Sequence, residues 1–261
     1  MVSVVILSKN PPKKLFKDLD NQVFKDFEVI IASEKGIVSA MNNALKKAKG
    51  DIFVRIDDDV ELPSYWLKEL IKPFSDPTIA GVTGPTFIPP ERRKYRDSIC
   101  FVDKPHWFLM WLYDNEPYAP AKIYKCGSVS YGSNFMEKMN GFDPYKIDHL
   151  EGTNWAMRTE LIRKVGGFDP KFDGVAEWFD TDVVYKIKKL GYKIQYKRKA
   201  YLFHMIEPLN GKDNRHEGFG RIKNWLIFHV RHSKFHPKMI LFLLTWTGYF
   251  AWVRFRSLFR Q

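Results

Sequence analysis

The feature that most constrains the fold is a regular alternation of strand-like and helix-like segments in the first 88 residues. The strand-like runs are short, apolar and rich in β-branched residues, and they span residues 2–7, 28–32, 52–56 and 79–82. Between the second and third runs, apolar residues recur at helical spacing from Val38 to Ala48, and Gly50 follows as a stop signal. This alternation predicts a mostly parallel sheet with helices on both faces.

Three consecutive aspartates, Asp57, Asp58 and Asp59, follow the third strand-like run directly. In parallel sheets of this class, ligands bind beyond the carboxyl ends of the strands. Adjacent carboxylates repel one another unless a cation neutralises them, and their hard oxygens suit Mg²⁺ or Mn²⁺. The triplet therefore predicts a divalent metal site. The structural alternative is a solvated acidic turn that caps the next helix.

Two further polar positions lie near the ends of predicted elements. Asp180 or Thr181 is expected to cap a helix that ends before Gly191, and a carboxylate there is stabilised by the helix dipole. His204 follows the last strand-like segment. An ordinary helix cap and a structural histidine are the simpler interpretations of these residues.

The C-terminal part of the chain is apolar and basic. Residues 239–253 are almost wholly apolar or aromatic, and Arg254, Arg256 and Arg260 follow them. This run is shorter than the roughly 20 residues that span a bilayer. Its aromatic residues, among them Phe242 and Trp246, predict an anchor at an anionic membrane surface. A helix docked on the rest of the chain, or an oligomer contact, is the alternative.

The whole chain of 261 residues has a formal net charge of +12 and a sequence pI near 9.5. Polyanionic partners are therefore expected, although a lysine-rich solvated surface explains the charge equally well. No secretory signal pattern opens the sequence, and Cys100 and Cys126 match no metal spacing. We expect a cytoplasmic protein that is peripheral on the inner face of the cell membrane.

Three segments in order carry a resemblance to a known family: "VRIDDDVELP", "EGTNWAMRTELIRKVGGFDPKF", and "EWFDTDVVYKIKKLGYKI" followed by "AYLFH". Together they resemble family 2 of the glycosyltransferases over about residues 2–204. The resemblance implies an α/β fold of the GT-A type, with a doubly wound, mostly parallel sheet, to which we add a C-terminal helical, membrane-proximal tail. We expect a catalytic domain at 1–205, divided into a nucleotide-binding half at 1–88 and an acceptor-side half at 89–205, and the tail at 206–261.

The same resemblance implies an inverting, metal-dependent transferase of the hexosyltransferase class that uses a nucleotide diphosphate sugar. The D-x-D motif matches Asp57 and Asp59, and His204 matches a histidine that completes the metal site. The general base matches Asp180, although Phe179 stands where the family has a glutamate and Glu177 lies close by.

The remaining implied contacts fall into two groups. The candidate donor-binding residues are Ser8, Asn10, Glu34, Asn42, Asp57 and Asp58, with Met41 in the place of the family's phosphate-binding arginine. The candidate acceptor-side residues are Glu151, Asn154, Arg158 and Trp178. The expected partners are the sugar donor, a glycan or lipid-linked acceptor, and an anionic membrane surface.

Two other functions stay open at this point. A sugar-phosphate nucleotidyltransferase also uses aspartates and Mg²⁺, but it needs a glycine-rich phosphate loop after the first strand, and "LSKNPPKK" has no glycine. A basic nucleic-acid-binding module would fit the net charge. No nucleic acid is expected, because no recognised motif is present and clustered aspartates repel phosphate.

Overall fold

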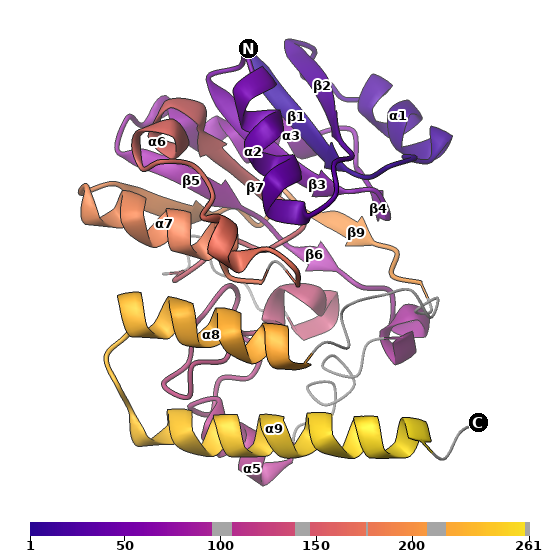
Figure 1. Cartoon of the computed structure of the whole chain (residues 1–261). Helices are drawn as coiled ribbons and strands as arrows, with labels where there is room; N and C mark the ends of the chain where they lie inside the picture. Colours follow the sequence, from indigo (N-terminus) through magenta and orange to yellow (C-terminus); the bar gives the residue numbers. More distant parts are fainter. Residues whose placement is uncertain (96–105, 139–146, 176, 208–217, 259–261) are drawn as a thin grey trace.

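The computed structural model describes residues 1–95, 106–138, 147–175, 177–207 and 218–258. Within these residues the main sheet has six strands, in the order β2-β1-β3-β7-β5-β8 (Figure 1). The strands are β1 (Val2–Leu7), β2 (Phe27–Ala32), β3 (Ile52–Asp57), β5 (Ile79–Thr83), β7 (Asn154–Arg158) and β8 (Lys193–Tyr196). All run parallel except β7, which lies antiparallel between β3 and β5. The prediction of a mostly parallel sheet is confirmed.

The antiparallel strand β7 determines which loop reaches the edge of the sheet where β1, β3 and β5 end, which we call the carboxyl edge. In the register with β3, Asn154 pairs with Ile56 at this edge and Arg158 pairs with Ile52 at the opposite one. The segment that precedes β7 therefore lies at the carboxyl edge beside the aspartate triplet.

Helices cover both faces of the sheet, as the alternation in sequence predicts (Figure 1). They are α1 (Lys13–Asp20), α2 (Ile37–Lys47), α3 (Trp66–Ile71), α6 (Thr159–Lys164) and α7 (Phe179–Lys189). Successive strand residues point to opposite faces. Val5 and Phe53 belong to the apolar cluster of α2, α6 and α7, whereas Val4 and Val54 belong to that of α1 and α3. Both faces are thus packed and dry.

A small second sheet continues the chain beyond the carboxyl edge. Its strands are β4 (Val60–Glu61), β9 (Leu202–His204) and β6 (Thr86–Phe87), in that order. β4 pairs antiparallel with β9 and places Val60 opposite His204. This pairing joins the segment after the aspartates to the last strand of the fold.

The remaining described elements include α5 (Trp107–Leu112), α8 (Gly218–His232) and α9 (Pro237–Leu258), which lie below the sheet in Figure 1. The others are short 3₁₀ turns at Lys72–Ser75, Pro90–Tyr95, Gly132–Asn134, Met136–Lys138 and Pro170–Phe172. α8 packs against α7, and α9 packs against α8. In the described part of the chain, no helix combines the length and the apolar character that crossing a membrane requires.

Two expectations about these helices need correction. α7 begins at Phe179, so Asp180 and Thr181 lie inside its first turn and Trp178, at a left-handed φ of 73°, is the cap residue. In α9, Phe242 and Trp246 are partly buried against the core, so they are not the exposed anchors that the sequence predicted. The other expected anchors are arginines. The side chains of Arg254 and Arg256, and the whole of Arg260, lie outside the described part of the chain.

Candidate active site

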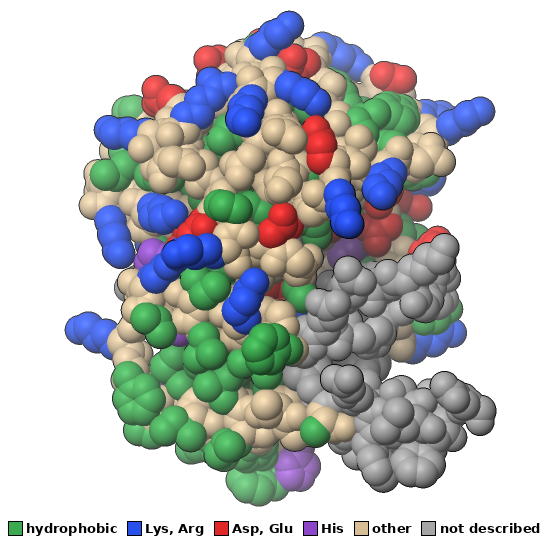
Figure 2. Space-filling view, in the orientation of Figure 1, with side chains coloured by type: hydrophobic (Ala, Val, Ile, Leu, Met, Phe, Trp, Pro, Cys, Tyr) green, Lys and Arg blue, Asp and Glu red, His purple; other side chains and the backbone are tan. Residues whose placement is uncertain are grey.

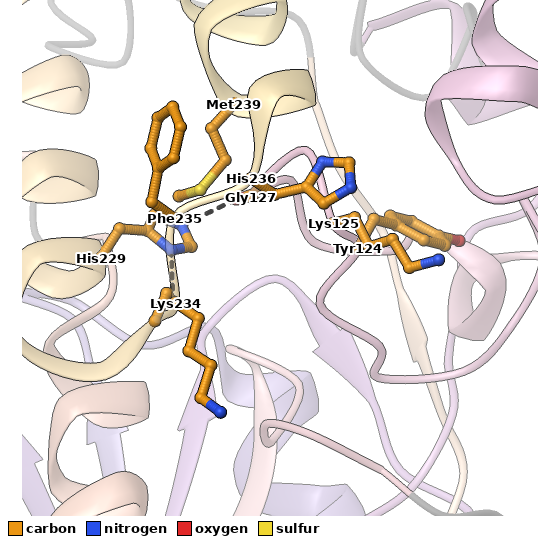
Figure 3. A pocket seen from close by; sticks show the side chains of 9 residues that line it. Tyr124, Lys125, Gly127, His229, Lys234, Phe235, His236 and Met239 are labelled. Atoms are coloured by element: carbon orange, nitrogen blue, oxygen red, sulfur yellow. Dashed lines mark hydrogen bonds between the residues drawn. The ribbon is translucent and has the colours of Figure 1, made fainter.

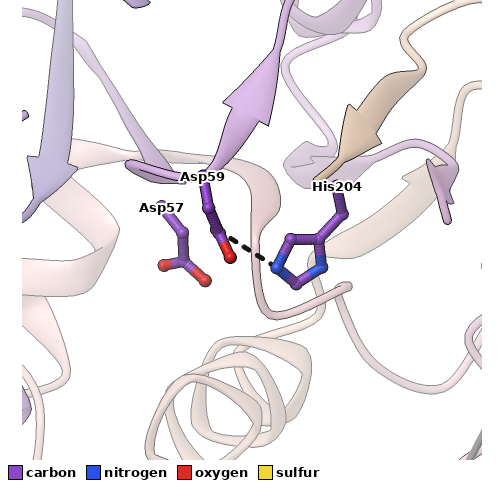
Figure 4. A group of neighbouring side chains, drawn as sticks. All are labelled: Asp57, Asp59 and His204. Carbon is purple, nitrogen blue, oxygen red and sulfur yellow. Dashed lines mark ion pairs between the residues drawn. The ribbon is translucent and has the colours of Figure 1, made fainter. Parts of the chain in front are cut away.

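The three predicted metal ligands meet at the carboxyl edge (Figure 4). Asp57 ends β3, Asp59 follows it, and His204 comes from β9 across the short β4–β9 pairing. One possible ligand atom from each residue lies within 4.8 Å of the others, and the His204 Nε2 atom is 3.2 Å from Asp59 Oδ1. Residues 145 positions apart in the chain are therefore held as one group by backbone pairing.

The donor set of this group fits a divalent cation. Two carboxylates and an imidazole are ligands that Mg²⁺ and Mn²⁺ accept, and the partly exposed aspartates leave room for further oxygen ligands. Asp58 lies beside the group. Burial raises the pKa of its carboxyl above the ordinary value, and the negative charges of Asp59 and Asp57 add to this effect. A cation at this position would relieve that repulsion.

The residues that follow β1 contact the same aspartate triplet. Ser8 follows β1, and its hydroxyl donates a hydrogen bond to Asp58 Oδ2. The Asn10 backbone N–H donates to Ser8 Oγ at 3.1 Å. The Asn10 side chain is exposed beside this turn. The structure thus brings together Ser8 and Asp58, two of the candidate donor-binding residues.

Asp180 lies at the other side of the group and is connected to it by Arg55. The Arg55 side chain, 9% exposed, donates from Nη2 to Asp57 Oδ1 at 2.8 Å, and its Nη1 lies 3.6 Å from Asp180 Oδ2. Burial raises the pKa of the Asp180 carboxyl, whereas the Arg55 guanidinium opposes that rise. One buried cation therefore joins the aspartate of the predicted metal group to the predicted base.

Arg55 was not among the residues that the sequence singled out. It stands two positions before Asp57 on β3, so both side chains leave the strand on the same face. The signal that could have identified it is a charged residue within the otherwise apolar, buried run 52–56, because such a charge needs a partner. Its guanidinium also lies 5.6 Å from the centre of the Phe179 ring.

The loop before β7 contributes buried polar groups to the same region. Glu151 is 7% exposed and His149 is 5% exposed. Glu151 Oε1 and His149 Nε2 have no hydrogen-bond partner in the described structure. Burial raises the pKa of the Glu151 carboxyl, and the negative charge of Asp180 adds to the rise. Unpaired buried polar atoms are costly, so their presence beside Asp180 indicates a place for a polar ligand.

The other predicted acceptor-side residues of β7 have structural roles instead. Asn154 is fully buried; it donates to the Pro85 and Ala200 carbonyls and accepts from Trp66 Nε1. Arg158 lies at the opposite edge of the sheet, where its guanidinium donates to three backbone carbonyls, those of Phe74, Asp76 and Ile79. The structure thus shows structural contacts for both residues: Asn154 is buried at the carboxyl edge and Arg158 lies at the opposite edge, so neither set of contacts supports an acceptor-side role.

Asn42 also differs from its prediction. Its side chain donates to the Phe168 carbonyl at 2.7 Å and accepts from the Phe168 N–H at 3.0 Å. Both ends of the amide are occupied by this backbone contact, which fastens α2 to the turn after α6. The predicted donor contact of Asn42 is therefore replaced by a structural one.

Three remaining candidates make contacts outside the metal group. Glu34 lies in the loop after β2, and its carboxylate accepts from the Ser33 N–H and pairs with Lys47. Trp178 is almost buried, and its ring stacks on Phe228 of α8 with 4.6 Å between the centres. Glu177, the alternative base, pairs with Arg221 of α8 at 2.5 Å. An ion-paired carboxylate is less suited to accept a proton than Asp180.

The sequence of this chain matches one family model. The model is described as Glycosyl transferase family 2, and it matches residues 8–166, more than half of the chain. The matched region includes the aspartate triplet and ends before Asp180 and His204. No curated protein matches the chain.

Two solved structures share the fold at low sequence identity. The mannosyltransferase PcManGT from Pyrobaculum calidifontis, in complex with GDP-Man and Mn²⁺, has a TM-score of 0.51 and 18% identity, with 95% of this chain and 69% of that chain covered. GalNAc-T7 with UDP, GalNAc and Mn²⁺ has a TM-score of 0.53 and 15% identity, with 88% of this chain and 47% of that chain covered. These likenesses establish the fold, and the predicted GT-A architecture is confirmed.

Proposed function

This chain belongs to glycosyl transferase family 2, and on that premise we propose that it transfers a sugar, of the hexosyl class, from a nucleotide diphosphate sugar to an acceptor hydroxyl. The observation that carries the proposal is the group of Asp57, Asp59 and His204 at the carboxyl edge, with the buried Asp180 beside it. The family match favours glycosyl transfer over the sugar-phosphate nucleotidyltransferase and the nucleic-acid-binding module.

Asp57, Asp59 and His204 are the residues that would hold Mg²⁺ or Mn²⁺. When bound, such an ion neutralises the charge that develops on the leaving diphosphate. The two solved structures of this fold each contain Mn²⁺ together with a nucleotide, which supports the same ligand class here.

The donor lies, in this proposal, along the ends of β1, β2 and β3. Ser8, Asn10 and Glu34 follow the first two of these strands, and Asp57 and Asp58 end the third. The support is the hydrogen bond from Ser8 to Asp58, which draws the end of β1 onto the acidic segment. A ribose and a base would contact these polar side chains. The family match covers this whole region.

Asp180 is the proposed general base. An acceptor hydroxyl is a weak nucleophile, and a carboxylate that removes its proton during attack on the anomeric carbon lowers the barrier. Burial raises the Asp180 pKa, which makes the carboxylate a better proton acceptor near neutral pH. Direct attack from the side opposite the leaving group inverts the anomeric centre. Arg55 positions Asp180 relative to Asp57.

The proposed acceptor side is formed by Glu151 and Trp178, and its substrate is a glycan or a lipid-linked glycan. The unpaired Glu151 Oε1 atom supports a hydroxyl-rich ligand. Residues 1–205 form the catalytic unit, with donor and acceptor halves that meet near residue 88, and residues 206–261 form a basic and aromatic addition. We propose that the protein acts in the cytoplasm, at the inner face of the cell membrane.

A screen of nucleotide sugars for slow, metal-dependent hydrolysis tests this function. One donor should be hydrolysed in the presence of Mn²⁺ or Mg²⁺, and chelation of the metal should abolish the reaction. Asp180→Asn should retain donor binding and lose transfer to an acceptor. If no nucleotide sugar is bound or hydrolysed with either metal, the proposal is contradicted.

A further inference from the structure

The outer surface of the C-terminal helices carries unpaired apolar side chains. On α9, Met239 and Phe242 face the core, whereas Ile240 and Leu244 point outward and are 52% and 64% exposed. These two lie one helical turn apart on the same face. Phe235, in the turn between α8 and α9, is 71% exposed. α9 is therefore packed on one face and uncovered on the other.

Helix α5 extends this uncovered surface with two tryptophans. Trp107 is 71% exposed and Trp111 is 45% exposed. Lys238, in the first turn of α9, donates to the Trp111 carbonyl, and its ammonium lies 4.4 Å from the Trp111 ring centre, which fixes α5 against α9. We call the set Trp107, Trp111, Phe235, Ile240 and Leu244 the docking face. Figure 2 shows hydrophobic side chains gathered over α8 and α9.

The sequence of the C-terminal helices is basic. From Gly218 to Gln261 the sequence contains eight Lys and Arg residues and no Asp or Glu. Asp114 of the α5 segment is neutralised by Lys238 at 2.9 Å. Arg221 and Arg231 are paired as well, with Glu177 and with Asp169 and Asp182, so the positive charge beside the apolar surface comes from residues such as Lys125 and Lys234. An apolar surface with basic residues beside it complements an anionic bilayer, since aromatic residues settle among the headgroups and basic residues attract them.

A small cavity opens beside Phe235 and strengthens this inference (Figure 3). Its volume is about 220 Å³, and Lys125, Lys234 and His236 line it together with Tyr124 and Met239. Gly127 lies at its floor, where a side chain would clash with Trp225 at 2.6 Å. A cavity with an apolar wall and basic side chains fits the phosphate of a lipid headgroup next to the start of an acyl chain.

We propose that the docking face lies on an anionic lipid bilayer, with Lys125 and Lys234, whose side chains extend in different directions from the cavity (Figure 3), each contacting lipid phosphates. The surface comes from more than one element, because α5 contributes Trp107 and Trp111. The inward-facing Phe242 and Trp246 of α9 pack against the protein core and do not insert into the bilayer. Trp178 stacks on Phe228 of α8, so the same helix connects the docking face to the turn that carries Asp180. Bilayer binding itself does not depend on the proposed function. Its role in bringing the active site to a lipid-linked acceptor rests on that function.

Vesicle co-sedimentation of the full chain tests the proposal. Vesicles of phosphatidylcholine alone are compared with vesicles that also contain phosphatidylglycerol, at low and high salt. The triple variant Trp107→Gln, Phe235→Gln, Leu244→Gln removes exposed apolar side chains, so its fold should persist. The matched control is Val23→Gln, Tyr65→Gln, Leu190→Gln, three apolar residues exposed elsewhere on the protein.

The wild type should sediment with the anionic vesicles at low salt and be released at high salt. The bound-to-free ratio should fall at least about tenfold for the docking-face variant and stay within about twofold for the control. The double variant Lys125→Gln, Lys234→Gln should bind the anionic vesicles more weakly than the wild type does, with no change in binding to vesicles of phosphatidylcholine alone. Melting temperatures, measured in parallel, should match the wild type.

Three outcomes overturn the proposal. The first is wild-type protein that stays in the supernatant with anionic vesicles at low salt. The second is an equal loss of binding in the docking-face variant and the control. The third is a wild-type dimer, seen by light scattering, that the docking-face variant dissociates while neither binds vesicles. Because the assay contains no sugar donor, its failure leaves donor hydrolysis, and so the proposed function, unaffected.

Discussion

Asp182→Asn should destabilise the protein in a strongly pH-dependent way. Asp182 lies in α7, and its side chain is wholly buried. His232 Nε2 lies 2.8 Å and Arg231 Nη1 3.2 Å from its Oδ1 atom, while Lys186 Nζ lies 2.7 Å from Oδ2. Two of these partners, Arg231 and His232, come from the end of α8. The Asp182 carboxylate therefore fastens α8, and the docking face beyond it, to the helix that carries Asp180.

The magnitude follows from the pKa of this carboxyl. Burial alone would raise the pKa, but His232, Lys186 and Arg231 outweigh burial and lower it from 3.8 to about 2. That fall corresponds to about 2 kcal/mol of native-state stability at neutral pH. In a chain of this size, a loss of about 2 kcal/mol lowers the melting temperature by about 4–8 °C.

The direction with pH follows from the lowered pKa. The unfolded carboxyl takes up its proton near pH 3.8 and the folded one only near pH 2, so the stabilisation is complete above pH 3.8 and is lost as pH falls toward 2. Thermal melts of the wild type and Asp182→Asn from pH 7 to pH 3 measure this. The exposed Asp20→Asn, at the end of α1, is the matched control, with a change of less than about 0.5 kcal/mol.

The result that refutes this reasoning is a difference below about 0.5 kcal/mol at pH 7. A larger difference that stays constant from pH 7 to pH 3 refutes it equally, since the loss would then come from packing rather than from charge.

The other predictions concern the reaction. Asp180→Asn should lower turnover by about 10²–10⁴-fold with donor affinity nearly unchanged, measured by initial rates and by titration of donor. If Glu177→Gln gives that loss and Asp180→Asn does not, the base is Glu177. Because Asp180 acts as the anion, activity should be lost as pH falls through its raised pKa. Arg55→Met removes the opposing positive charge, so the acidic limb of kcat/KM should move to higher pH; a pH–rate profile identical to the wild type would contradict the positioning role.

Local patterns were enough to predict the main-sheet strands within the first 88 residues, but not the short strands β4 and β6. Each strand from β1 to β5 in the main sheet is a β-branched run, and α2 shows the expected spacing from Val38 onward. Strand β7 was not predicted, because its five residues include no β-branched residue and its buried position depends on pairing with β3 and β5. The structural contacts of Asn154 and Arg158 were not predicted for the same reason, because the direction of a strand in a sheet is a long-range property.

The candidate site was predictable where its residues adjoin a strand end. Asp57, Asp59 and His204 meet as expected, because the triplet follows β3 and the histidine ends β9. The contact of Arg55 with both Asp57 and Asp180 could not be predicted from the sequence, because it depends on where α7 begins in the fold. The tail was predicted as helical, but only the packing of Phe242 inward distinguishes the face of α9 that is free from the face that is buried.

Calorimetric titration of GDP or UDP, with and without Mn²⁺, tests the central claim that the Asp57, Asp59 and His204 group holds a metal for a nucleotide donor. In the wild type, Mn²⁺ should strengthen binding of one nucleotide at least about tenfold. Asp59→Ala should abolish that dependence while the circular dichroism spectrum stays unchanged, because Asp59 lies beyond a strand end rather than in the core. Glu61→Ala, which removes a nearby carboxylate paired with Lys14, should keep the dependence. Nucleotide binding of equal affinity in the wild type and in Asp59→Ala, with or without Mn²⁺, would contradict the account.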